Sequence, residues 1–253
     1  MDIELIRARL NLYALLQNFE QLVQLDREVA QSVKQWNVSI QFSVLNGPSA
    51  SLDFQNGVCK HAIGSHPNPA IRLFFLSPRH LNKMFDGSGT PIPLKGFSRL
   101  GFLQKDFTQL TERLEYYLKP DNARNEDGDY RRINTTLTLY TAAHAIKELA
   151  LLEPTCNAVF SHTPAGILQI GVLPEGPYVH LVLTKDGISV GKGSHASPTA
   201  TMTFRDIESA NALLGGRLDA FQAVAEQRLM LNGMIPIIDN IGLILDRVEH
   251  YLK

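Results

Sequence analysis

The chain has 253 residues, of which 44% are hydrophobic and 19% charged, and its 24 basic and 25 acidic side chains give a net charge of −1. This composition excludes a disordered chain, and the balance of charge argues against a nucleic-acid-binding protein. The sequence contains no stretch of about 18 consecutive apolar residues, so no membrane span is expected. The N-terminal residues lack the basic and apolar regions of a signal peptide, so we expect a cytoplasmic protein.

The first 119 residues predict a helix followed by short strands. Apolar residues at three- and four-residue spacing between Leu12 and Val23 indicate an amphipathic helix. Alternating patterns then predict four strands, at 39–45, 51–55, 58–63 and 71–76. Gln55-Asn56-Gly57 is typical of a hairpin turn, and Ser77-Pro78 predicts the start of a helix over 79–85.

A charged segment follows. Eight of the fourteen residues from Lys119 to Arg132 are charged, and Pro120 and Gly128 lie among them. Proline and glycine interrupt helices, so we predict a linker over 120–132 between two domains, 1–119 and 133–253.

The second domain repeats the order of elements. Leu139, Ala143 and Ile146 indicate a helix. Strands are predicted at 167–173, 178–184, 188–194 and 200–204, a helix at 205–214 with Asp206 as a candidate N-cap, a strand at 228–231 and a helix at 237–252. Short strands joined by turns predict a mainly antiparallel sheet, so each domain is expected to be an α/β (α+β) unit with helices covering the sheet.

The two domains also share sequence. With a shift of 129 positions, Ser65-His66 before Pro69 matches Ser194-His195 before Pro198. The same shift pairs Gly47-Pro48 with Gly176-Pro177, Phe75 with Phe204, Asn82 with Asn211, Gly87 with Gly216, and Arg99-Leu100 with Arg228-Leu229. A shift of 127 pairs Tyr13 with Tyr140, and a shift of 134 pairs Arg113-x-Glu115-x-Tyr117 with Arg247-x-Glu249-x-Tyr251. Chance matches would not hold a near-constant shift, so a tandem duplication is predicted.

The segment from Ala200 to Gly233 resembles the sterol carrier protein type-two family of lipid-transfer proteins. That family runs from a strand through a helix with an acidic start to small-Gly-basic-Leu-Asp, here Gly215-Gly216-Arg217-Leu218-Asp219. A short helix, then basic-Leu-x-Leu-x-Gly and a last helix follow, and Arg228 to Gly233 match the basic-Leu-x-Leu-x-Gly segment here. The resemblance covers roughly 157–253 and, through the repeat, 38–119. It implies an apolar cavity between sheet and helices, and carriage of lipids without catalysis.

The first copy departs from this pattern over 88–98. Pro91 and Pro93 prevent a regular helix where the second copy can form one over 217–227. We therefore predict that the second copy is the better-formed binding unit and that the first is specialised for contact with the other copy or with another protein. A lid and simple sequence drift are the alternatives for this segment.

A carrier cavity needs inward-facing aliphatic and aromatic side chains. The ligand-binding residues predicted in the second copy are Phe204, Leu213, Leu214, Phe221, Leu229, Leu231, Met234, Ile238 and Ile241. Any protein core uses the same residue types, so packing alone is the alternative role for each. Because a buried charge is costly, aspartate at Phe221 or Leu213 should lower fatty-acid uptake more than a change at Glu226.

Catalytic and metal-binding patterns are lacking. No Gly-x-Ser-x-Gly elbow occurs, and Gly187 to Ser194 misses the spacing of a phosphate loop. Cys59 and His61 have no further ligands nearby at metal-binding spacing, so no metal or cofactor is expected. His66 and His195 are expected to bond to loop backbone, with a ligand headgroup as the alternative partner.

These patterns predict a non-enzyme that binds or carries a hydrophobic small molecule, such as a lipid, a fatty acyl chain, or a sterol-like or quinone-like compound. The alternative is a non-catalytic scaffold or accessory subunit that uses the same fold to contact an enzyme partner. Transient membrane contact is compatible with either function, whereas nucleic acid and a transmembrane segment are not expected.

Overall fold

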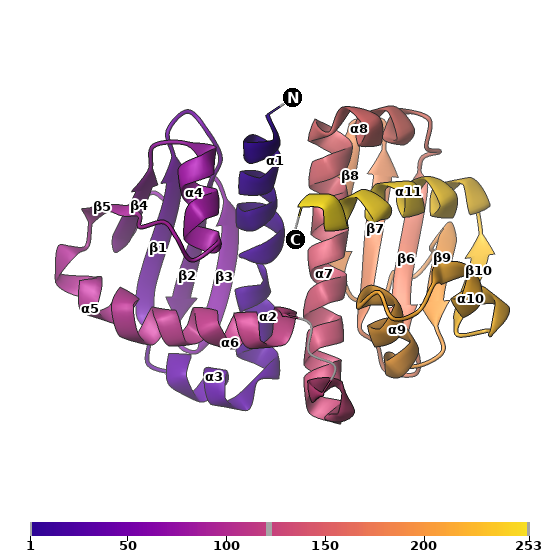
Figure 1. Cartoon of the computed structure of the whole chain (residues 1–253), viewed down its shortest axis with the longest axis horizontal. Helices are drawn as coiled ribbons and strands as arrows, with labels where there is room; N and C mark the ends of the chain where they lie inside the picture. Colours follow the sequence, from indigo (N-terminus) through magenta and orange to yellow (C-terminus); the bar gives the residue numbers. More distant parts are fainter. Residues whose placement is uncertain (1, 120–122, 252–253) are drawn as a thin grey trace. The chain divides into compact units, whose positions relative to one another are not determined.

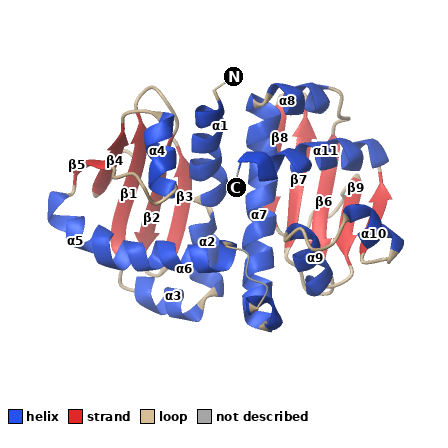
Figure 2. Cartoon of the chain, viewed as in Figure 1, coloured by secondary structure: helices blue, strands red, loops and turns tan. Residues whose placement is uncertain are grey.

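The computed structural model describes residues 2–119 and 123–251 and divides the chain into two compact units, 1–119 (unit 1) and 120–253 (unit 2). Each unit holds a five-stranded sheet with helices packed in front of it (Figures 1 and 2). The predicted α/β class with a mainly antiparallel sheet is confirmed.

Unit 1 begins with a helical run and ends with another. Its helices are α1 (Ile3–Leu10), a π-helical turn (Asn11–Leu15), α2 (Asn18–Leu25), α3 (Arg27–Val33), α4 (Pro78–Phe85), α5 (Leu100–Phe102), a second π-helical turn (Leu103–Phe107) and α6 (Thr108–Leu118). Its strands are β1 (Asn37–Val44), β2 (Ser49–Gln55), β3 (Val58–Ile63), β4 (Ile71–Phe75) and β5 (Ile92–Lys95).

Unit 2 contains a similar series. Its helices are α7 (Gly128–Leu152), α8 (Pro154–Ser161), α9 (Ile207–Leu214), α10 (Ala220–Ala225) and α11 (Ile235–Tyr251). Its strands are β6 (Gly166–Val172), β7 (Tyr178–Thr184), β8 (Gly187–Lys192), β9 (Ala200–Phe204) and β10 (Leu229–Gly233).

The predicted linker over 120–132 is too long at its C-terminal end. Pro120 to Asn122 lie outside the described residues, but α7 already begins at Gly128. The Asp127 side chain accepts hydrogen bonds from the backbone N–H groups of Asp129 and Tyr130, which caps the helix. Glycine is therefore tolerated in the first turn, and residues 128–132 are helical.

The strand order is the same in both units, β3-β2-β1-β4-β5 and β8-β7-β6-β9-β10. The expected antiparallel meander is wrong at one pairing in each described sheet, because β1 pairs with β4, and β6 with β9, in parallel. After the edge strand β3 or β8 the chain crosses the sheet to add the next strand beside β1 or β6, which a meander does not do.

One face of each sheet forms the core. In unit 1, Ile40 pairs with Leu52 and Phe42 with Ala50, and all four side chains are buried. Leu168 and Leu181 form the corresponding buried pair in unit 2. Alternate residues point to the opposite face, as the two-residue period of a strand requires.

Two of the residue pairs used to predict the duplication fall on matching elements. Tyr13 lies in the first helical run of unit 1 and Tyr140 in α7. Tyr117 lies in α6 and Tyr251 in α11, the last helix of each unit.

The match of Arg99-Leu100 with Arg228-Leu229 is wrong. Arg228-Leu229 leads into the edge strand β10, whereas Arg99 lies in a 3₁₀ turn and Leu100 begins α5. Unit 1 has no counterpart of α10 among its described residues and reaches its edge strand, β5, earlier. Proline is compatible with such a strand because only one side of an edge strand bonds to a neighbour.

Candidate functional site

The nine predicted ligand-binding residues of unit 2 do not share one environment. The buried ones are Phe204, Leu229, Ile238 and Ile241, the half-buried ones Leu213, Leu214 and Leu231, and the exposed ones Met234 and Phe221. Packing and ligand contact are both compatible with the positions of the buried and half-buried residues.

The buried members form part of an apolar layer beneath α11. Phe204 and Leu229 are register partners across β9 and β10, and α11 packs on β9. Ile237, Ile238, Ile241 and Ile244 of α11 are all buried. Their side chains fill the space between helix and sheet, and we refer to this region as the α11 layer. A ligand-lining role for its residues stays a prediction.

Phe221 lies on the outward side of α10, with 86% of its surface exposed. Asp219 caps this short helix by accepting from the Phe221 and Gln222 N–H groups, and Ala223 is the residue that faces inward. Residues two apart on a helix point in nearly opposite directions. The expectation of an inward-facing Phe221 is therefore wrong.

Two shallow hollows in the described part of the chain are lined by residues outside the α11 layer. One, of about 280 Å³, is lined by Arg205, Asp206, Glu208, Glu226 and Arg228. The other, of about 230 Å³, is lined by Glu28, Val29, Ser32, Trp36, Asp106, Gln109, Leu110 and Arg113. Pockets for small molecules usually span about 300–1,000 Å³, so neither hollow as it stands holds a large ligand.

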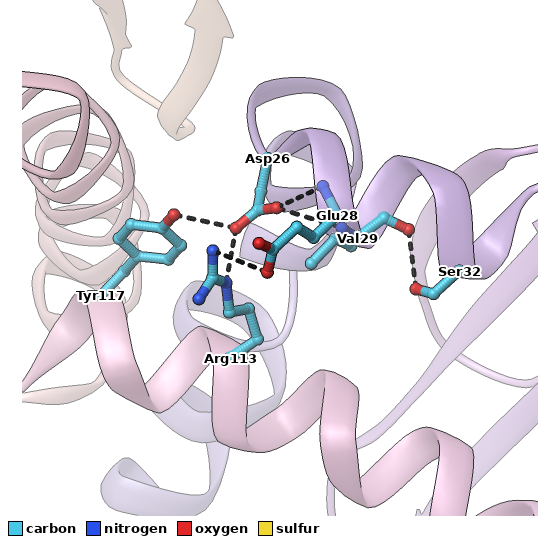
Figure 3. A network of polar contacts seen from close by, with 6 residues as sticks. All are labelled: Asp26, Glu28, Val29, Ser32, Arg113 and Tyr117. Carbon is cyan, nitrogen blue, oxygen red and sulfur yellow. Dashed lines mark hydrogen bonds and ion pairs between the residues drawn. The ribbon is translucent and has the colours of Figure 1, made fainter.

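The hollow in unit 1 borders a buried polar network (Figure 3). Asp26 caps α3 by accepting from the N–H groups of Glu28 at 2.8 Å and Val29 at 3.0 Å. Its other oxygen accepts from Arg113 Nε at 2.6 Å and from the Tyr117 hydroxyl at 2.8 Å. We call Asp26, Arg113 and Tyr117 the unit 1 clasp, because they fasten the last helix to α3.

Charge in the unit 1 clasp is well compensated. Burial by itself would raise the pKa of Asp26, but the hydrogen bonds from Val29, Arg113 and Tyr117 outweigh it and hold that pKa below its ordinary value. Burial, together with the bond to Asp26, raises the pKa of Tyr117. The clasp therefore holds an ionised carboxylate and a neutral phenol at neutral pH.

Unit 2 has a related but simpler arrangement, the unit 2 clasp. Glu153 caps α8 by accepting from Cys156 N–H at 2.6 Å and pairs with Arg247 Nη2 of α11 at 3.1 Å. Among the described hydrogen bonds, none joins Tyr251 to Glu153, and the buried Nε of Arg247 has no partner. The last helix is thus fastened by fewer bonds in unit 2.

The turns that contain the two repeated histidines, His66 and His195, form the same hydrogen bonds. His66 Nδ1 accepts from Asn68 N–H, and His195 Nδ1 accepts from Ser197 N–H, both at 3.1 Å. The backbone N–H groups of these histidines donate to Gln41 and Gln169, which match in the two sheets. The predicted bonding of both histidines to loop backbone is confirmed.

Other reactive side chains are occupied or buried. His61 Nε2 contacts the Leu12 carbonyl oxygen at 2.8 Å. Burial, and then the neighbouring Glu153, raise the pKa of Cys156 to about 12. Within residues 2–119 and 123–251, no group of three or more His, Cys, Asp or Glu side chains could hold a metal ion. No helix in these ranges is long and apolar enough to cross a membrane.

Sequence reasoning missed Asp26, Glu153 and Trp36. The shift of 127 that pairs Tyr13 with Tyr140 also pairs Asp26 with Glu153, so a repeated carboxylate was visible. Trp36 is the only tryptophan of the chain, and it packs edge-on against Phe54 and Phe102 beside the hollow.

No protein-family model matches the chain, and neither does any curated protein. Solved structures similar to parts of it include a UbiJ-SCP2 ubiquinone synthesis protein, at 16% identity and a TM-score of 0.33, covering 42% of this chain and 94% of that one. Sterol carrier protein 2 like 2 from Aedes aegypti is 21% identical, with a TM-score of 0.30 and coverages of 43% and 94%. Sterol carrier protein domain 2 of Helicoverpa armigera is 12% identical, with a TM-score of 0.35 and coverages of 46% and 91%. All three carry the domain that the sequence of unit 2 resembles.

Proposed function

We propose that unit 2 binds and carries a hydrophobic small molecule of the lipid class in the α11 layer. The observation that carries this proposal is the incomplete burial of apolar side chains around the layer. Leu214 and Leu231 are half-buried, and Met234, directly before α11, is 38% exposed. Apolar surface left in water favours a ligand that removes it from water, at roughly 25 cal/mol per Å².

Binding in this layer requires α11 to shift, because its buried isoleucines fill the space between the helix and the sheet. The unit 2 clasp offers little resistance to such a shift. It consists of one charge pair between Glu153 and Arg247, and the arginine side chain is 42% exposed, so water weakens the attraction. The methionine at the start of the helix can adapt to ligands of different shape.

The proposal includes a non-catalytic role. Cys156, a potential nucleophile in unit 2, is buried, and its raised pKa keeps it in the unreactive thiol form near neutral pH. Arg205, Asp206, Glu226 and Arg228 around the larger hollow engage one another or the ends of neighbouring elements. These arrangements support binding rather than chemistry.

Titration of the delipidated chain with a fluorescent fatty acid tests the proposal. Leu231→Asp should weaken uptake by at least tenfold, because a charge in an apolar site costs several kcal/mol. Phe221→Asp is the matched control: the same charge is placed on the same unit but in water, and uptake should not change. Absence of uptake by the unmodified chain, or equal loss in both folded variants, would contradict the proposal.

The filled α11 layer favours a second candidate function, a scaffold or accessory subunit. Such a protein needs a solid core and no space for a ligand. Native mass spectrometry of gently purified protein separates the two functions. A bound small molecule that dissociates on activation supports the carrier, whereas a stable complex with another protein and no small molecule supports the scaffold.

A further inference from the structure

The edge of the sheet in unit 1 carries apolar side chains exposed to solvent. Strand β5 and the turn after it present Ile92, Leu94 and Phe97, which are 37%, 51% and 64% exposed. Edge strands usually avoid such residues, because they invite association with another apolar surface. Three within six positions therefore make this edge a candidate docking surface.

The surroundings of these residues are strongly basic. Residues 70–105 contain six arginines and lysines and a single acidic residue, Asp86, which forms an ion pair with Arg7 at 3.0 Å. Lys95, Arg99 and Lys105 are exposed within or just after the apolar segment. We call Ile92, Leu94, Lys95, Phe97, Arg99 and Lys105 the basic edge. Asp106, which follows it, instead lines the hollow beside Trp36.

The basic edge is held in a fixed conformation. Gly96 has φ +88°, and a Cβ atom at this position would lie 2.7 Å from the Ala70 carbonyl oxygen. The Lys95 ammonium donates to Asn68 at 2.7 Å. Because the turn is tight against the neighbouring strand, Phe97 is presented outward without an ordering cost at the moment of binding.

We propose that the basic edge docks unit 1 on an anionic lipid surface. The apolar side chains would enter the headgroup region while the three basic side chains meet lipid phosphates, a combination typical of interfacial membrane binding. The charge of the segment selects this occupant over an uncharged or basic protein surface. The inference deepens the proposed function, since a carrier must exchange its hydrophobic cargo with a membrane.

Vesicle flotation of the full chain tests the inference. Vesicles of phosphatidylcholine are compared with vesicles containing about 30% phosphatidylglycerol, at low and high salt. Lys95→Gln/Arg99→Gln/Lys105→Gln should lower partitioning onto anionic vesicles by about two orders of magnitude, at roughly fivefold per basic residue. Leu94→Ser/Phe97→Ser should lower it at least tenfold.

Phe221→Ser is the matched control, because it removes an exposed phenylalanine outside the basic edge and should leave partitioning unchanged. Thermal melts establish that each variant is folded. Equal binding to neutral and anionic vesicles, or no binding to either, would overturn the inference, as would equal loss in the control. If the chain does not bind vesicles but still takes up fatty acid, only the docking inference fails. If it binds vesicles as expected but takes up no fatty acid, only the carrier function fails.

Discussion

Units 1 and 2 share a strand order but differ between the fourth strand and the edge strand. In unit 2 the chain forms α10 before entering β10, whereas in unit 1 it passes through Pro91 directly into β5. An edge strand bonds to one neighbour only, so the sheet accepts either route. The edge is therefore the variable part of the sheet, where a unit can acquire an added property without disturbing its core.

The clasps differ as well. Asp26 accepts four hydrogen bonds, two of them from side chains of α6, the last helix of unit 1. Glu153 is bonded to α11, the last helix of unit 2, through Arg247 alone. Unit 1 thus holds its last helix with more side-chain hydrogen bonds and presents a basic edge, whereas unit 2 holds its last helix mainly by apolar packing.

Removal of the clasp carboxylates should have the largest effect. Asp26→Ala is expected to destabilise unit 1 by about 3 kcal/mol, because it removes a helix cap and the two hydrogen bonds that Arg113 and Tyr117 donate to this carboxylate. Glu153→Ala should cost unit 2 less, about 2 kcal/mol, because one side-chain bond and one cap are lost. Urea unfolding followed by Trp36 fluorescence reports on unit 1, and amide hydrogen exchange in α11 reports on unit 2. An equal loss in both units would remove the contrast between the clasps.

The next largest loss of stability is expected from a substitution in the tight turn of the basic edge. Gly96→Ala is expected to destabilise unit 1 by about 2 kcal/mol, since alanine disfavours positive φ and its Cβ would meet the Ala70 carbonyl. Gly101→Ala is the control, because Gly101 lies in α5 with open space around it and alanine favours a helix. Trp36 fluorescence in urea distinguishes the two, and an unchanged midpoint for Gly96→Ala would show that the turn is not under constraint.

The smallest mutational effect is expected at the phenol of the unit 1 clasp. Tyr117→Phe removes one hydrogen bond to Asp26 and should cost about 1 kcal/mol. The pKa of Tyr117 is raised in the folded chain, so its share of stability is present below the phenol's ordinary pKa and is lost as the pH rises through the folded value. The variant should therefore unfold with less dependence on alkaline pH than the unmodified chain.

The carboxylates of both clasps should lose their stabilising contribution at acid pH, whereas Tyr117 loses its contribution at alkaline pH. The pKa values of Asp26 and Glu153 lie below their ordinary values, so each carboxylate contributes stability above its unfolded pKa, and the contribution is lost as the pH falls through the folded pKa. Asp26→Asn should flatten the acid side of the stability profile of unit 1. A profile identical to that of the unmodified chain would show that other groups govern acid unfolding.

Much of the fold follows from local sequence. The Gln55-Asn56-Gly57 turn has positive φ at Asn56 and Gly57, as a tight hairpin requires, and Asp206 caps α9 as predicted. The alternating strands also lie close to their predicted positions. These features depend on a few neighbouring residues, which is why a single sequence reveals them.

What sequence could not predict depends on partners distant in the chain. β5 contains Pro93 and is a strand only because β4 offers it a free edge. Phe221 faces outward because Ala223 takes the inward position on a helix too short to bury both. Whether Ile238 and Ile241 line a cavity or fill it is decided by how closely α11 packs on the sheet, which no local pattern specifies.

The unit 1 clasp also bears on how the chain folds as it is made. Arg113 and Asp26 are 87 residues apart in sequence, so the clasp is a contact of very high sequence separation. During synthesis the sheet of unit 1 can assemble from residues 37–95 while Asp26 caps α3 alone. Only when α6 has left the ribosome does the carboxylate gain its arginine and phenol. The last helix is therefore the last part of unit 1 to be made, and a chain that ends before residue 113 would lack the arginine and the phenol that stabilise the Asp26 carboxylate.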